Sequence, residues 1–155
     1  VFLPDFDSEW IAEFYLAVRV SRLGKTVSGK FAPRYFDALT VAMRLVPVTL
    51  TEMLRSAGRP DAVASIFDTA FTAGEWMAAD SFGPATEAQV NETSVTLSHV
   101  NDAAAEAVAA VSRYSTIKTG DLIMPYRITP PKSVQTGTHI SCSLDGNVCI
   151  SLKIH

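Results

Sequence analysis

Residues 10–20 alternate between apolar and more polar positions. One row contains Trp10, Phe14, Leu16, Val18 and Val20, and the other contains Glu13, Tyr15, Ala17 and Arg19. A period of two over this length predicts a β-strand with one buried face. Residues 39–48 are rich in β-branched side chains and predict a second, more completely buried strand.

The rest of the chain predicts shorter elements. We expect helices at 32–38, at 52–57 with Thr49 or Thr51 as the cap, at 60–66, and at 103–113 with Asn101 or Asp102 as the cap. Strands are expected at 121–128, 138–144 and 148–154, a strand or hairpin at 89–97, and an irregular connection at 67–85. The resulting fold class is strand-dominated α+β, with a mixed β roll or barrel-like sheet.

The two cysteines flank a predicted hairpin turn at 145–147. A two-residue loop would place the cysteines directly opposite each other but would put the apolar rows of the two strands on opposite faces. We favour a three-residue loop, which would pair Leu144 with Val148 and bring both apolar rows to one face. That register places Cys142 and Cys149 on opposite faces. We therefore expect two free thiols, a reducing compartment and a cytoplasmic location.

Composition narrows the possible partners. The 155 residues are 48% hydrophobic with a net charge of −3, which predicts one domain spanning residues 1–155. Basic residues are nowhere adjacent, so no nucleic-acid partner is expected. No apolar stretch reaches the roughly 18 residues of a membrane span, and acidic residues at 5, 7 and 9 argue against a signal peptide. We expect no membrane association.

Common catalytic motifs are missing from the sequence. His99, His139 and His155 lie far apart, no Cys-x-x-Cys pair occurs, and neither a Gly-x-Ser-x-Gly motif nor a glycine-rich phosphate loop is present. Surface or loop positions are expected for all three histidines.

Several segments carry a family resemblance. Residues 4–45 (from PDFDSEW to TVAMRL), IFDTAF at 66–71, Gly74, residues 114–128 (YSTIKTGDLIMPYRI) and residues 143–154 (SLDGNVCISLKI) resemble the fumarylacetoacetate hydrolase family. The resemblance covers nearly the whole chain but not the family's N-terminal lead-in. It implies the family's catalytic-domain fold and a homodimer.

The family's metal-binding positions have changed. The family binds a divalent ion, usually Mg²⁺, through a Glu-x-Glu pair on one strand and an Asp on a later strand. These positions align with Glu13, Tyr15 and Arg44. Arginine stays charged, and two charges about 4 Å apart at an effective dielectric of about 20 interact by about 4 kcal/mol. We therefore expect no metal and no other cofactor. Arg44 either occupies the ion position and pairs with Glu13, or extends to solvent.

Other positions of the family's site differ as well. Pro47-Val48-Thr49 stands where the family has Ala-Arg-Asp, and Ser65 aligns with a substrate-contacting Lys. Pro125 to Ile128 replace a Thr-Gly-Thr-Pro turn. Asp68 matches a family position, where we expect it to brace a turn.

Two functions follow from the resemblance. The first is a protein that has lost the Mg²⁺-dependent activity and serves a structural, binding or partner-subunit role, as a homodimer or beside an active paralogue. The alternative is a hydrolase, isomerase or decarboxylase of small 2-oxo or diketo acids. In that case Arg44 or Arg127 would hold the substrate carboxylate, and Glu13 or Tyr15 would transfer a proton.

Overall fold

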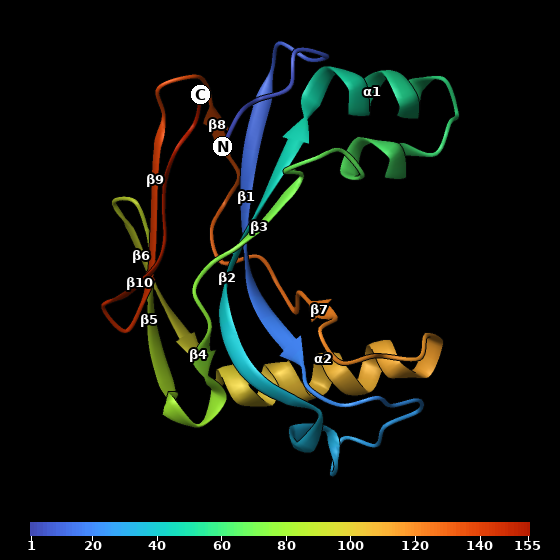
Figure 1. Ribbon diagram of the computed structural model, residues 1–155, viewed down its shortest axis with the longest axis vertical. Coiled ribbons are helices and arrows are strands. Elements are labelled where there is room, and N and C mark those ends of the chain that lie inside the picture. Colours follow the sequence, from blue (N-terminus) through green and yellow to red (C-terminus); the bar gives the residue numbers. More distant parts are fainter.

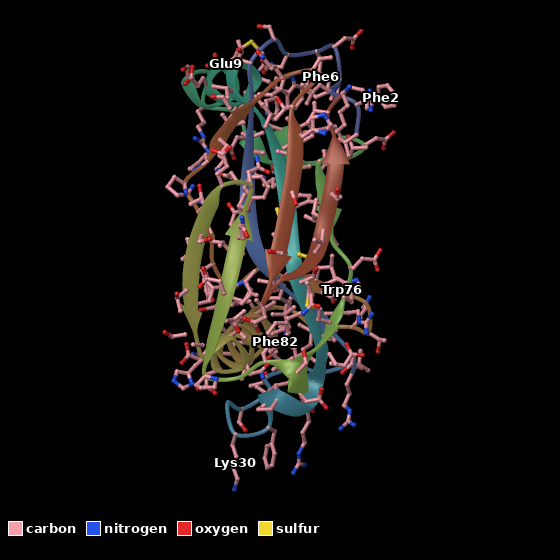
Figure 2. All side chains as sticks on the ribbon, turned by 90° about the vertical axis from the view of Figure 1, so that its left-hand side faces the viewer. Phe2, Phe6, Glu9, Lys30, Trp76 and Phe82 are labelled. Atoms are coloured by element: carbon pink, nitrogen blue, oxygen red, sulfur yellow. The ribbon has the colours of Figure 1, made fainter.

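The computed structural model describes residues 1–155, which form two antiparallel β-sheets with a long helix packed at one end (Figure 1). The larger sheet has six strands in the order β3-β2-β1-β7, with β4 also paired to β2 and β8 to β1. The second sheet has the order β10-β9-β5-β6, and its strands lie side by side on the face seen in Figure 2. The strand-dominated α+β class is confirmed. The sheets do not close into a barrel.

The elements have the following bounds. The strands are β1 (Trp10–Val20), β2 (Phe36–Pro47), β3 (Phe71–Ala73), β4 (Met77–Ala78), β5 (Ala85–Val90), β6 (Thr93–Ser98), β7 (Leu122–Ile123), β8 (Lys132–Val134), β9 (His139–Leu144) and β10 (Asn147–Lys153). The helices are α1 (Val48–Ser56) and α2 (Val100–Tyr114), and the 3-10 turns are η1 (Ala32–Tyr35), η2 (Asp61–Ser65) and η3 (Ala79–Ser81).

The β1–β2 pair forms the centre of the larger sheet. The predicted bounds of β1 and its buried face are confirmed, because Phe14, Leu16 and Val18 are completely buried. β2 begins at Phe36, so the predicted helix at 32–38 shrinks to a single 3-10 turn. The cause is that residues 36–38 gain backbone partners on β1, with Ala38 opposite Arg19.

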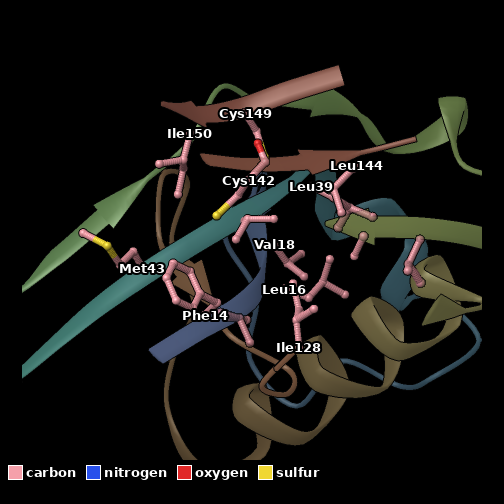
Figure 3. Close-up of a cluster of buried hydrophobic side chains, with 14 of the residues drawn as sticks. Phe14, Leu16, Val18, Leu39, Met43, Ile128, Cys142, Leu144, Cys149 and Ile150 are labelled. Carbon is pink, nitrogen blue, oxygen red and sulfur yellow. The ribbon is translucent and has the colours of Figure 1, made fainter. Parts of the chain in front are cut away.

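The hydrophobic core lies between the two sheets and α2 (Figure 3). Phe14 and Met43 contribute from the larger sheet, Leu144 and Ile150 from the second sheet, and Val108 from α2. Thirty buried residues belong to this one cluster.

The hairpin between β9 and β10 differs from the prediction at its turn. Leu144 pairs with Asn147 across a two-residue loop, and a bulge between Val148 and Ile150 then restores the expected pairing of Cys142 with Ile150. The bulge turns Cys149 inward, so both cysteines are buried instead of lying on opposite faces. They are unbridged, and the Cys149 thiol donates to the Cys142 carbonyl at 3.3 Å.

Both helix caps also differ from the prediction. α1 begins at Val48, and the Asp7 carboxylate accepts a hydrogen bond from the Leu50 N–H at 2.8 Å. Asp7 therefore performs the capping role assigned to Thr49 or Thr51. α2 begins at Val100 after His99, whose left-handed backbone (φ 46°) provides no side-chain cap. The Asn101 amide instead donates to the Ala79 carbonyl.

Three further segments differ from the predicted elements. The predicted irregular connection at 67–85 contains β3, β4 and η3, and residues 89–97 belong to the β5–β6 hairpin. The predicted strand at 121–128 is reduced to β7, and its remainder pairs with β1 through an isolated bridge between Tyr15 and Arg127. The predicted helix at 60–66 is the 3-10 turn η2. No helix has the length and apolar character needed to cross a membrane.

Candidate functional site

The outward face of the β1–β2 pair carries a polar cluster. Glu13 on β1 lies directly opposite Arg44 on β2, and the bridge between Tyr15 and Arg127 brings a second arginine to the same place. Glu13 and Tyr15 share this face because side chains two residues apart on a strand point the same way. The structure therefore assembles all four sequence candidates: Glu13, Tyr15, Arg44 and Arg127.

The Glu13 carboxylate is the hub of this cluster. Its Oε2 accepts hydrogen bonds from Tyr15 Oη at 2.8 Å and from Arg44 Nη1 at 3.1 Å. Its Oε1 accepts a longer contact of 3.5 Å from Arg127 Nη1. The predicted contact between Arg44 and Glu13 is present, so Arg44 does not simply extend to solvent.

Ser65 completes the surroundings of Arg44. Arg44 Nη2 donates to Ser65 Oγ at 2.6 Å, and the Phe71 ring centroid lies 6.0 Å from the guanidinium carbon. Arg44 Nε is buried without a hydrogen-bond partner. From the sequence, Ser65 was singled out only because it aligns with a substrate-contacting lysine of the family. Its contact with Arg44 depends on how η2 folds back toward β2, for which no local pattern exists.

The cluster carries an excess of positive charge. Two guanidinium groups face one carboxylate, and their side chains differ in exposure: Glu13 is 12% exposed, Arg44 27% and Arg127 44%. The Arg44–Glu13 pair is thus largely shielded from solvent, where charge–charge interactions are stronger than at a surface. Arg127 is the more exposed partner and makes the longer contact with Glu13.

Tyr15 is held as a hydrogen-bond donor. Burial raises the pKa of its phenol, and the hydrogen bond to Glu13 and the negative charge of that carboxylate raise it further. The phenol therefore stays protonated at neutral pH, where it can donate to Glu13 but cannot act as a base.

The donor set does not fit a magnesium ion. Mg²⁺ requires hard oxygen ligands in a near-octahedral arrangement, commonly including one or two carboxylates. Glu13 is the only carboxylate in the cluster, and no three His, Cys, Asp or Glu residues anywhere in the chain lie close enough together to hold a metal. An ion beside Glu13 would also face the charges of Arg44 and Arg127.

The remaining predicted positions lie outside this cluster. Asp68 is exposed at a turn in which the Ala70 N–H donates to the Phe67 carbonyl. His99 lies 3.8 Å from Asp102, and His155 stacks on Phe2 with ring centroids 5.2 Å apart. The three histidines form no common site.

Searches by sequence give no relatives: no protein-family model matches, and no curated protein is similar. Structural similarity is extensive. The architecture is that of the fumarylacetoacetate hydrolase fold.

Three solved structures illustrate the likeness. Fumarylpyruvate hydrolase from Pseudomonas aeruginosa, in complex with Mn²⁺ and pyruvate, superposes with a TM-score of 0.82 at 20% identity, over 99% of this chain and 69% of that chain. A fumarylacetoacetate hydrolase family protein from Yersinia pestis superposes with a TM-score of 0.83 at 20% identity, over 100% of this chain and 74% of that chain. The 5-carboxymethyl-2-hydroxymuconate delta-isomerase from Mycobacterium smegmatis superposes with a TM-score of 0.78 at 19% identity, over 99% of this chain and 62% of that chain. At these identities the likeness establishes the shared fold.

Proposed function

We propose that this chain is a divergent member of the fumarylacetoacetate hydrolase family that has lost the metal-dependent reaction and serves a structural, binding or partner-subunit role. The observation that carries this proposal is the Arg44 guanidinium bridging Glu13 and Ser65. The resemblance places the family's metal ligands at Glu13, Tyr15 and Arg44, so the third ligand has become a cation.

Charge balance supports the replacement. Arg44 and Arg127 together present two positive charges to Glu13, the same formal charge as a divalent ion. A guanidinium donates hydrogen bonds but cannot coordinate an oxygen as a Lewis acid does. The cluster therefore retains the electrostatic stabilisation of Glu13 without the catalytic property of the ion.

A metal titration tests this proposal. Calorimetric titration of the wild-type protein with MgCl₂ and with MnCl₂ should give no binding heat. The variant Tyr15→Glu with Arg44→Asp restores the family's acidic residues and should gain metal affinity. Tyr114→Glu with Arg59→Asp makes the same change in charge at exposed positions elsewhere and should gain none. Micromolar binding by the wild type, or equal gains in both double variants, would contradict the proposal.

A second candidate function is the binding of a small carboxylate. Arg127 favours it, because this guanidinium is 44% exposed and only loosely engaged by Glu13 at 3.5 Å. One more cation than carboxylate in the cluster leaves charge available for an anionic ligand. The pyruvate complex of the Pseudomonas aeruginosa enzyme makes pyruvate the natural probe.

Pyruvate titration followed by NMR distinguishes the two candidates. Binding should shift the resonances of residues 13–15 and 126–128, and Arg127→Gln should weaken it by about tenfold. Arg59→Gln, which removes an exposed arginine elsewhere, should have no effect. If pyruvate causes no shift, or if Arg127→Gln binds as tightly as the wild type, this candidate is wrong.

A further inference from the structure

A second concentration of positive charge lies at the other end of β1. Residues 14–36 contain five basic residues and no acidic one, although the whole chain has a net charge of −3. Val20 lies seven positions beyond Glu13 along β1, about 23 Å of extended strand, and most of this basic segment follows Val20. Lys30 marks this end of the molecule in Figure 2.

Three of these cations surround a hollow of about 370 Å³, which we call the cationic hollow. Its lining includes Arg22, Lys25 and Arg34, the hydroxyl groups of Thr26 and Ser28, and the ring of Tyr35. No carboxylate lines it. None of the three cations forms an ion pair with Asp or Glu, whereas Arg19, Arg44, Arg55 and Arg127 all do.

Each of the two arginines lies over an aromatic ring. The guanidinium carbon of Arg22 lies 5.9 Å from the Tyr35 ring centroid, and that of Arg34 lies 5.1 Å from the Phe31 ring centroid. A guanidinium packed on a ring keeps the N–H groups at its edge available for an anion. Lys25 Nζ donates to the Tyr114 carbonyl at 3.3 Å, which holds the third cation at the end of α2.

The backbone beneath the hollow is equally well anchored. Gly24 and Ile117 exchange two backbone hydrogen bonds of 3.0 and 2.9 Å, and the Val27 N–H donates to Ser112 Oγ at 2.9 Å. A Cβ at position 24 would lie 2.6 Å from Cε1 of Tyr35, so only glycine permits this packing. The backbone of the hollow is thus already ordered, so binding of a ligand would not carry the entropic cost of ordering a loop.

We propose that the cationic hollow binds a ligand through a phosphate group. A phosphate monoester or diphosphate carries about two negative charges near pH 7 and offers several acceptor oxygens. Three cations and two hydroxyl groups match that demand better than the single charge of a carboxylate. Two kinds of ligand carry such a group: a soluble phosphate compound or a phospholipid headgroup. For a phospholipid, Leu23, which is 65% exposed beside Arg22, would provide an apolar contact with the membrane.

The test compares two matched double variants. Arg22→Gln with Arg34→Gln removes two cations of the hollow and preserves much of the side-chain volume. Arg59→Gln with Lys153→Gln removes two exposed cations elsewhere that also lack carboxylate partners. Each protein is titrated with sodium pyrophosphate by calorimetry and sedimented with phosphatidylcholine vesicles with and without a phosphatidylinositol phosphate. Circular dichroism checks that every variant is folded.

Pyrophosphate binding by the wild type, weakened at least about tenfold by the first double variant and little by the second, supports a soluble ligand. Sedimentation only with phosphoinositide vesicles, lost in the first double variant alone, supports a lipid headgroup. Absence of binding in both assays, or equal weakening in both double variants, overturns the proposal. None of these outcomes depends on the Glu13–Arg44 cluster.

Discussion

The two faces of the β1–β2 pair have very different characters. The inward face carries Phe14, Leu16 and Met43, all completely buried in one apolar cluster. The outward face, one residue along each strand, carries Glu13, Tyr15 and Arg44 joined by hydrogen bonds. The same backbone thus supports both a conventional core and a polar cluster of charged and hydrogen-bonded side chains.

This difference shows that the fold and the chemistry depend on separate residues. Inward positions are interchangeable within limits of volume and polarity, so the architecture tolerates about 80% sequence difference from its structural neighbours. Outward positions depend on charge, and an acidic side chain in place of Arg44 would reverse the charge facing Glu13 without changing the pairing of the strands.

The largest effect should come from the inward face. Phe14→Ala removes a completely buried ring and should lower the free energy of unfolding by about 3–5 kcal/mol, measured by urea denaturation. Tyr15→Phe, the next residue on the outward face, loses only a partly exposed hydroxyl and should cost about 1 kcal/mol or less. Similar losses in both variants would contradict the division between the two faces.

A smaller effect is expected when the carboxylate of the cluster is removed. Glu13→Gln leaves Arg44, which is only 27% exposed, without its counter-charge and should cost about 2 kcal/mol. Adding Arg44→Met removes the unpaired cation and should recover part of that stability. The check is a double-mutant cycle by urea denaturation. A cycle with no coupling would show that the Arg44–Glu13 pair contributes nothing to the fold.

A smaller loss of stability is expected when the Asp7 cap of α1 is removed. Asp7→Ala should cost about 1 kcal/mol at pH 7, because it removes the acceptor for the Leu50 N–H at the start of α1. Asp5→Ala, which changes an exposed carboxylate nearby without this contact, is the matched control.

The cost of Asp7→Ala should also depend on pH. Burial opposes ionisation of Asp7, but the hydrogen bonds from Glu9, Leu50 and neighbouring groups outweigh it and lower the pKa of the carboxyl. A group with a lowered folded-state pKa contributes its full stability above the unfolded value of about 3.9 and loses it as the pH falls through the folded value. The stability difference between wild type and variant should therefore narrow below about pH 4. A constant difference down to pH 2 would exclude this role.

The smallest effect belongs to a surface ion pair at the far end of β1. Asp37→Asn removes the negative charge and one of the two oxygens that accept hydrogen bonds from Arg19, but both side chains are well exposed. The loss should be about 0.5 kcal/mol or less and should diminish further in 1 M NaCl. A loss as large as that of Glu13→Gln would show that exposure does not distinguish the two ion pairs.

Regular alternation located β1 to the residue, whereas the short strands β3, β4 and β8 carry no such pattern and were not predicted. The β9–β10 bulge was not predictable, because two turn lengths satisfy Asp145-Gly146-Asn147 and only packing against the other sheet selects the inward Cys149. The cap of α1 was missed because it also depends on tertiary structure, since Asp7 reaches Leu50 across 43 positions of sequence.

In the candidate site too, contacts within paired strands were predictable and contacts from distant segments were not. The contact between Glu13 and Arg44 was expected from the resemblance and requires only that the two strands pair. The contacts made by Ser65 and Phe71 depend on the path of the segment after α1, which carries no periodic signal.

A crystal structure of the wild-type protein soaked in MnCl₂, with anomalous data collected at the manganese edge, tests most directly whether Arg44 stands in the place of a metal ion. We predict no anomalous peak at Glu13, with the Arg44 guanidinium lying between Glu13 and Ser65. A manganese peak in contact with the Glu13 carboxylate, with Arg44 displaced, would contradict it.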